Sequence, residues 1–307
     1  MRWGVFSGAL WGLDTVVLGL ALSLLPFLDA PEASLASALL HDAICAIILF
    51  AYMALRGRLK NTLAAIKTRS GKAIALGALL GGPFGMTGYL IAINNIGPGF
   101  TAIISTFYPA VGTFLAYIFL KERMRPRQIL ALLVALGAIV LIGYSSTGVT
   151  SEGNPIIGIV AALACVFGWG SEAVILAWGM KDDEVDEDSA LQIRETTSAL
   201  VYLAVVGPIA GVIGFTFTAA PTPATGIIAL AALAGTCSYL FYYKAINTIG
   251  ASRGMALNIS YSAWAVIFAF LIMGTAPTLL QVICCLVILV GTVLAATPNW
   301  KELRSGW

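Results

Sequence analysis

Two acidic motifs stand inside apolar sequence, each beside a tryptophan. Glu172 follows Trp169 by one helical turn within the stretch 156–180, and Asp14 follows Trp11 in the same Trp-Gly-x-acid pattern near the N-terminus. An ionisable group at membrane depth usually faces a bundle interior or an aqueous cavity, so it is a candidate functional residue. A carboxylate beside an aromatic face suits a desolvated organic cation. The motifs therefore predict a site for a cationic small molecule.

Other ionisable residues also lie within apolar stretches. His41 and Asp42 are adjacent, as are Arg194 and Glu195, and we consider these four with Asp14 as candidates for coupling or gating. His41 is the side chain whose charge changes most readily near neutral pH. A plain structural role is an alternative for His41, and snorkelling to the membrane surface is an alternative for Arg194 and Glu195. Glu172 could bind a proton when a cationic substrate leaves, which is what proton coupling requires.

Aromatic residues with polar tips recur at helical spacing. Tyr261 and Trp264 share one helix face with Asn258, and Tyr108 and Tyr243 lie in other apolar stretches. Tyr239 and Tyr242 form a further face with Tyr243. Such residues often make an interfacial belt or pack against lipid. Taken together, they favour a cation-binding cage.

Composition indicates a membrane protein. The 307 residues are 59% hydrophobic and only 10% charged, with a mean hydropathy of +0.93, whereas soluble domains carry about 25% charged residues. A net charge of +2 gives no nucleic-acid footprint. The single histidine and five cysteines show no zinc-ligand spacing, so we expect packing cysteines, no metal and no cofactor. No cleavable signal peptide is evident, because the N-terminus runs directly into a full-length apolar span.

The hydropathy pattern predicts an all-α integral membrane protein with ten transmembrane helices. A span needs about 20 mostly apolar residues. The candidates are 4–27, 34–55, 73–95, 100–120, 127–145, 156–180, 189–213, 225–246, 252–273 and 277–297.

Lysine and arginine in the short loops predict the orientation. Two connections, 56–72 and 121–127, are rich in these residues, and the C-terminus carries two more. The opposite loops, 28–33, 146–155 and 214–224, contain none. Positively charged loops stay in the cytoplasm, so we expect both termini to be cytoplasmic. The acidic loop 182–188 falls on the same side.

An internal repeat divides the chain into residues 1–148 and 149–307. Residues 92–97 match 245–250 at an offset of 153, which also places Tyr108 on Tyr261 and the pair His41-Asp42 on Arg194-Glu195. The Trp-Gly-x-acid motif repeats at an offset of 158. Each half contains five predicted spans, so the halves must be inverted in the bilayer. Inverted repeats with a site near the midplane are typical of transporters that work by alternating access.

Over essentially its full length the chain resembles the drug/metabolite transporter superfamily of EamA-like ten-helix carriers. The narrower resemblance is to bacterial choline permeases associated with phosphocholine decoration of teichoic acids. It rests on Ser7–Gly12, His41-Asp42, Gly77–Met86, Tyr108–Ala110, Trp169–Glu172, Ile193-Arg194, Ser238–Leu240, Tyr242-Tyr243, Ala245–Asn247, Leu257–Tyr261 and Trp264.

This resemblance implies uptake of choline, held in an aromatic pocket with one carboxylate. The residues it implies for the pocket are Trp11, Tyr108, Trp169, Glu172, Tyr243, Tyr261 and Trp264. Asp14 and Lys244 depart from the pattern, so betaine, carnitine or another methylated amine are alternative substrates. Lys244 would repel a cation if it faced the cavity, unless it snorkels to the cytoplasmic surface.

Three other functions compete with choline import. An exporter of amino acids or other metabolites is the alternative within the superfamily. An intramembrane enzyme would need a nucleophile with a base, or metal ligands, and the sequence shows neither arrangement. A scaffold would not need buried charges. No phosphate-binding loop occurs, so no nucleotide is expected. We expect a multi-pass protein of the bacterial inner membrane whose partners are the lipid bilayer and the substrate, working as a monomer, with a dimer as the alternative.

Overall fold

The structure is a computed structural model that describes residues 1–145, 153–182 and 184–300. Every regular element in these ranges is helical. Nine of the helical stretches are long and apolar enough to cross a membrane. The described chain is therefore an all-α membrane protein, as the sequence predicts.

In the described ranges the helical elements follow one another with no strand between them. They are α1 (Arg2–Leu22), α2 (Ala33–Leu55), α3 (Leu59–Ala65), α4 (Arg69–Leu79), the π-helical segment η1 (Leu80–Met86), α5 (Thr87–Ser105), α6 (Tyr108–Phe119), α7 (Pro126–Ser145), α8 (Pro155–Gly179), α9 (Glu187–Val201), the π-helical segment η2 (Tyr202–Val206), α10 (Gly207–Ile209), α11 (Ile213–Ala219), α12 (Pro223–Ile249), α13 (Ala251–Asn258), α14 (Tyr261–Met273) and α15 (Leu279–Ala296).

The predicted seventh span differs from the other nine. Residues 189–213 fall on α9, η2 and α10, which run without a break from Glu187 to Ile209, and this stretch is not among the nine apolar candidates. Its first turns carry Glu187, Asp188, Arg194 and Glu195, which lower its hydropathy. The same charged residues that are candidates for function lower the mean hydropathy of this stretch below that of the other nine.

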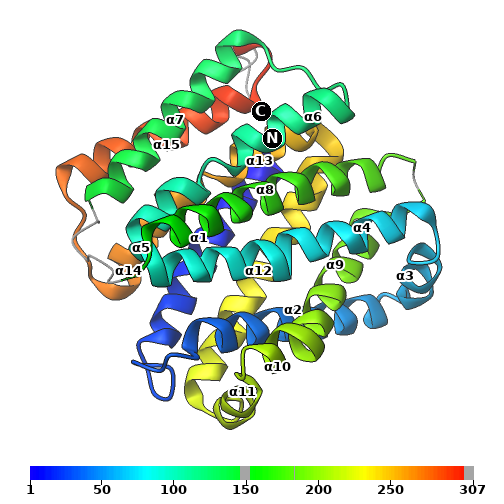
Figure 1. Ribbon diagram of the computed structural model, residues 1–307. Coiled ribbons are helices and arrows are strands. Elements are labelled where there is room, and N and C mark those ends of the chain that lie inside the picture. Colours follow the sequence, from blue (N-terminus) through cyan, green and yellow to red (C-terminus); the bar gives the residue numbers. More distant parts are fainter. Residues whose placement is uncertain (146–152, 183, 301–307) are drawn as a thin grey trace.

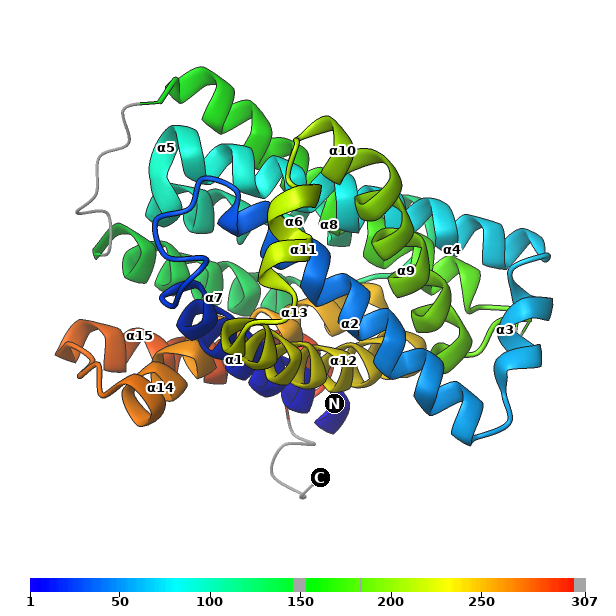
Figure 2. The same cartoon turned by 90° about the horizontal axis from the view of Figure 1, so that it is seen from below.

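Helices from the two halves of the chain pack against each other throughout (Figure 1). In the centre α8 packs against α5, η1 and α6, while α1 packs against α12 and α14. On one side α2 contacts α9 and α12, and α4 contacts α9. The pair α7 and α15 closes the opposite side, far from α3 (Figure 2). The helix α12 thus links the centre to the first side, since it contacts α1 and α8 as well as α2 and α9.

Two helix breaks recur at the offset of 153. Gly97 has φ 78° and ψ 162°, and Gly250 has φ 91° and ψ 161°. These positive φ angles favour glycine, which lacks the Cβ that would clash. Eleven residues later a second break occurs, and the helix resumes at Tyr108 in one half and at Tyr261 in the other. Both tyrosines therefore begin a helix at the middle of a broken span.

The segment η1 brings backbone close to the centre of the bundle. It contains three glycines around Pro83, and a proline inside a helix removes one backbone hydrogen bond. The Cα of Gly81 lies against the Glu172 carboxylate, so a Cβ at this position would overlap its oxygens. The Gly81 carbonyl accepts a hydrogen bond from Trp169 Nε1 at 3.0 Å. A widened, glycine-rich turn therefore supports both members of the second acidic motif.

Candidate functional site

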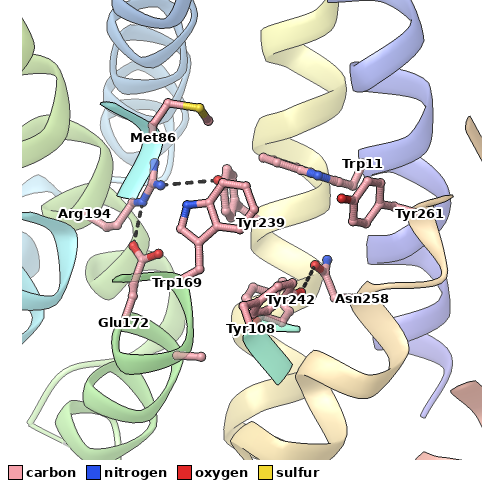
Figure 3. A pocket seen from close by; sticks show the side chains of 11 residues that line it. Trp11, Met86, Tyr108, Trp169, Glu172, Arg194, Tyr239, Tyr242, Asn258 and Tyr261 are labelled. Carbon is pink, nitrogen blue, oxygen red and sulfur yellow. Dashed lines mark hydrogen bonds and ion pairs between the residues drawn. The ribbon is translucent and has the colours of Figure 1, made fainter. Parts of the chain in front are cut away.

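An aromatic cavity lies where the broken helices meet the centre of the bundle (Figure 3). Its walls come from α1, η1, α6, α8, α9, α12, α13 and α14. The lining residues are Trp11, Met86, Tyr108, Trp169, Glu172, Ala173, Arg194, Tyr239, Tyr242, Asn258 and Tyr261. Six of these eleven side chains are tryptophan or tyrosine, so most of the wall consists of ring surface.

The rings are held in edge-to-face contact. Trp11 lies 4.9 Å from Tyr239 and 6.5 Å from Tyr261, measured between ring centroids, with interplanar angles of 71° and 85°. Tyr108 lies 5.8 Å from Trp169 at 89°. Rings in this arrangement fix one another's orientation, which favours a preformed cage. Such a cage can stabilise an alkylated ammonium group through cation–π interactions.

A polar chain runs along the wall of the cavity on the α13 side. The Tyr108 hydroxyl donates to Asn258 Oδ1 at 2.8 Å (Figure 3), and Asn258 Nδ2 donates to Ser7 Oγ at 2.9 Å. The hydroxyls of Ser7 and Ser238 are 3.3 Å apart. These bonds tie α6, α13, α1 and α12 together behind the rings.

Arg194 is the centre of a buried ion-pair cluster at one end of the cavity. Its Nε lies 3.0 Å from Glu172 Oε1, and its Nη1 lies 2.8 Å from Glu195 Oε1. Its Nη2 donates to the Tyr239 hydroxyl at 3.3 Å, and its guanidinium lies 4.7 Å from the Tyr239 ring centroid. Arg194 and Glu195 are 4% and 0% exposed. Both are therefore inside the bundle, and snorkelling does not explain them.

A second ion-pair group lies next to the first. His41 Nε2 is 3.1 Å from Asp14 Oδ1, and His41 Nδ1 is 3.5 Å from Asp42 Oδ1. Asp42 Oδ2 accepts a hydrogen bond from Ser198 at 2.5 Å and lies 3.9 Å from Arg194 Nη1. Asp42 thus joins the two groups into one network.

This network carries an excess of negative charge. Its ion pairs involve four carboxylates, on Asp14, Asp42, Glu172 and Glu195, but only one guanidinium and one imidazole. With all four carboxylates ionised, two negative charges would remain even when His41 is protonated. Unbalanced charge in a low-dielectric interior is unfavourable. The network therefore favours the binding of cations or protons beside the aromatic cavity.

A second cavity continues from the first toward the connection between α1 and α2. The two cavities share Trp11, Met86, Trp169, Arg194, Tyr239 and Tyr261. The second is also lined by His41, Asp42 and Asp14, and by Leu22 and Ser34 at the far ends of their helices. We call this second cavity the vestibule. A path lined by titratable groups thus leads from one side of the bundle to the aromatic cavity.

The structure places most of the residues named from the sequence around this centre, with two exceptions. Trp11, Tyr108, Trp169, Glu172 and Tyr261 line the aromatic cavity, whereas Tyr243 and Trp264 do not. Tyr243 is 0% exposed and packs behind Tyr239 with ring centroids 6.5 Å apart. Trp264 stacks on Phe268 at 6.2 Å, away from the lining.

Five lining residues were not named as site residues from the sequence. They are Met86, Ala173, Tyr239, Tyr242 and Asn258. On α12 the choice among Tyr239, Tyr242 and Tyr243 depends on which helix face meets the cavity, and spacing alone cannot decide that. Lys244 on the same helix is exposed, and its Nζ lies 4.5 Å from the Trp3 ring, so it does not line the cavity.

The fold and the cavity together define a multi-pass helical membrane protein with an internal small-molecule site. The family model of the EamA-like transporter family matches residues 1–144 and 156–297. The chain belongs to this family and is a membrane transporter of the drug/metabolite transporter superfamily. The superfamily membership predicted from the sequence is confirmed.

Two individual proteins show the extent of the likeness. Protein LicB of Haemophilus influenzae is 29% identical over 211 residues, which cover 64% of this chain and 66% of LicB. The match therefore spans just under two thirds of the length of LicB. A solved crystal structure with 17% identity covers 100% of this chain and 98% of its own chain, with a TM-score of 0.72. At that identity the likeness concerns the fold alone.

Proposed function

We propose that this protein is a secondary active transporter that imports choline or a related quaternary ammonium compound by alternating access. The observation that carries the proposal is the aromatic cavity beside a network with excess negative charge. A quaternary ammonium cannot donate N–H hydrogen bonds, so ring faces and nearby carboxylates are the groups that recognise it. The sequence resemblance to choline permeases supports the same substrate class.

The substrate site in this proposal consists of the aromatic cavity residues. Trp11, Tyr108, Trp169 and Tyr261 supply ring faces, as do Tyr239 and Tyr242. Glu172 contributes through the network, because Arg194 already pairs with it directly. The cation is thus attracted by the whole network and not by one free carboxylate.

Proton coupling is the part of the proposal that concerns His41, Asp14 and Asp42. Protonation of His41 adds one positive charge to the network, and deprotonation removes it again. A proton and a cationic substrate therefore compete electrostatically for the same network. The two cations are therefore exchanged across the membrane, and the net direction of choline movement follows the combined gradients of both.

Several features support the two inverted repeats, 1–148 and 149–307. The breaks at Gly97 and Gly250 have nearly the same φ and ψ. The packing of α1 on α12 and α14 has its counterpart in the packing of α8 on η1, α5 and α6. The pair of His41 with Asp14 corresponds to the pair of Arg194 with Glu172 at the repeat offsets. Ten spans containing both repeats would form a complete monomeric carrier in the bacterial inner membrane, with both termini cytoplasmic.

Amino-acid export is the alternative that the network disfavours. An amino-acid carboxylate would need a cation in the cavity, and Arg194 is the cationic side chain that lines it. Arg194 already contacts two carboxylates at 3.0 and 2.8 Å. A third carboxylate would add to the negative excess.

Uptake into proteoliposomes tests the proposal. Purified protein should accumulate radiolabelled choline when the proteoliposome interior is made more acidic than the medium, and unlabelled choline should compete while leucine should not. Collapse of the gradient with a protonophore should abolish accumulation. Accumulation of leucine with no choline uptake would instead support the amino-acid alternative.

A further inference from the structure

Beyond the aromatic cavity, on the side opposite the vestibule, the bundle is sealed. The offset of 153 pairs three partly exposed vestibule residues, Ala38, Leu90 and Ile93, with Leu191, Tyr243 and Ile246. Leu191 and Tyr243 are 0% exposed, and Ile246 is 2% exposed. The repeat equivalents of these three vestibule residues are thus present in the chain but buried.

Two unpartnered polar atoms lie in this sealed region. Glu195 Oε2 and the Tyr243 hydroxyl are buried and have no hydrogen-bond partner among the described residues. Buried polar groups are nearly always paired in native structures, so each exception asks for an explanation. Glu195 is the repeat equivalent of Asp42, which lines the vestibule. Both atoms would be solvated if the sealed wall opened as the vestibule does.

An ion-pair clasp closes the same end of the bundle. Arg58, between α2 and α3, contacts Asp186 at 2.9 Å and Asp188 at 2.6 Å. The Tyr52 hydroxyl donates to Asp188 at 3.4 Å. We call these four side chains the clasp. It joins the end of α2 in the first half of the chain to the start of α9 in the second half.

Two further bonds reinforce the acidic loop at this end. Ser70 donates to Asp182 at 2.7 Å, and Asn247 donates to Glu187 at 3.0 Å. The acidic loop, which the sequence alone suggests is a solvated turn, therefore contacts α4 and α12 as well as Arg58.

The opposite end of the bundle lacks an equivalent clasp. At the offset of 153, Arg58 corresponds to Gly211 and Asp188 corresponds to Leu35, and neither can form an ion pair. No ion pair joins α2 to the segment around Gly211 in the described part of the chain. Ion pairs therefore join the helices at the Arg58 end of the bundle, and the equivalent residues at the other end cannot form them.

We propose that the clasp is the latch of the closed cytoplasmic gate, and that Leu191, Tyr243 and Ile246 line the path that opens when Arg58 releases Asp186 and Asp188. The inference rests on the proposed function, since a gate implies alternating access. Glu195 and Tyr243 become the solvent-facing groups of the opened path, as Asp42 and Leu90 are in the vestibule. A substrate cation leaving the aromatic cavity meets a carboxylate and a tyrosine on its way out.

Cysteine accessibility tests the latch without any substrate. Cys237 is the native cysteine that is only half-buried, so Cys237→Ser gives a background of low reactivity. In this background Leu191→Cys reports on the path when a membrane-impermeant maleimide is added to inside-out vesicles. Ala38→Cys in right-side-out vesicles reports on the vestibule.

Arg58→Ala should increase labelling at Leu191→Cys by roughly 5-fold, because partly exposed ion pairs shift such equilibria by about that factor. Labelling at Ala38→Cys should fall. Lys67→Ala is the matched control, because Lys67 is an exposed cation of the same connection and lies outside the clasp. It should change neither rate. Arg58→Lys, which keeps the charge but loses the two-pronged geometry, should give an intermediate rate.

Equal labelling of Leu191→Cys with Arg58 and with Arg58→Ala would overturn the latch. A choline-dependent thermal shift measured on the same variants shows whether they are folded and tests the substrate proposal separately. If choline gives no shift in the parent protein but Arg58→Ala exposes Leu191→Cys, the substrate proposal fails while the gate stands. If choline stabilises every variant and labelling never changes, the gate fails while the substrate proposal stands.

Discussion

Trp169 connects the ring wall of the cavity to the backbone beneath it. Its ring lines the cavity and contacts Tyr108 edge to face, while its Nε1 is bonded to Gly81. We predict that Trp169→Ala weakens choline binding by about 0.5–2 kcal/mol, the range of a cation–π contact. Isothermal titration measures this directly. Trp178→Ala is the control, because Trp178 lies outside the lining and should leave affinity unchanged.

Glu172 balances Arg194 at the edge of the cavity. Replacement by Gln keeps the size of the side chain but leaves the guanidinium with one fewer carboxylate, so the network becomes less negative. We predict that Glu172→Gln lowers choline affinity with only a small change in Tm, because Arg194 keeps its contact with Glu195 at 2.8 Å.

Glu184→Gln is a suitable control for this variant, since Glu184 is exposed in the acidic loop. It removes the same charge from the protein without touching the network. If both variants lowered affinity equally, net charge alone would explain the effect and Glu172 would lose its assigned role.

His41 makes the network sensitive to pH. A protonated imidazole reduces the negative excess, so choline binding should weaken as pH is lowered through the range in which His41 becomes protonated. We predict that His41→Gln flattens this pH dependence and leaves binding at high pH close to that of the parent protein. Binding measured across this pH range checks the prediction. A pH profile unchanged by the substitution would assign His41 a structural role only.

At the scale of elements, η1 positions the acidic motif of the second half. A Cβ at Gly81 would overlap the Glu172 carboxylate. The backbone of Gly81 cannot move away without breaking the hydrogen bond that its carbonyl accepts from Trp169. We predict that Gly81→Ala lowers Tm by several degrees and reduces choline affinity. Gly137→Ala in α7 is the control, because its Cβ would meet no atom within 4 Å. It should be neutral or slightly stabilising.

The sequence predicts the elements well where hydropathy dominates and less well where charge or backbone geometry does. Nine of the predicted spans correspond to apolar helices, since a run of about 20 apolar residues has few alternatives in a bilayer. The seventh was less clear because Arg194 and Glu195 break its apolar pattern. The π-helical turn of η1 could not be predicted, because the glycines and Pro83 indicate a break in the helix but not whether it widens, tightens or kinks.

At the site, the sequence predicts which residue types are present better than it predicts which way each side chain points. The Trp-Gly-x-acid motif selects Trp169 and Glu172 because a buried carboxylate is unusual, and both line the cavity. The same reasoning takes Glu172 as a free anion, whereas the structure pairs it with Arg194. Long-range pairs of this kind depend on how α8 and α9 pack, which spacing along one helix cannot show. For the same reason the sequence predicts Tyr243 as a pocket residue, whereas Tyr239 lines the cavity.

At the scale of the whole molecule, each half of the chain contributes an ion pair at the same place in the repeat, and the two pairs differ in charge. His41 with Asp14 is the titratable pair, and Arg194 with Glu172 is its repeat equivalent with a permanent cation. The clasp at Arg58 adds a second asymmetry, because it closes one end of the bundle only. In the alternating-access cycle proposed above, a repeated scaffold with unequal charges would give the two facing states different energies and different proton affinities. That difference is what a coupled transporter needs.

The most direct test of this account compares choline with its neutral carbon isostere, 3,3-dimethyl-1-butanol, by thermal stabilisation of the purified protein. The two molecules share their shape and hydroxyl group and differ in the positive charge. A ligand that binds only the folded state raises Tm by mass action. We expect choline to raise Tm, the isostere to have no effect, and the shift with choline to shrink in Trp169→Ala and Glu172→Gln. Equal shifts with both ligands, or a shift with neither, would contradict recognition of a cation by the aromatic cavity and its charged network.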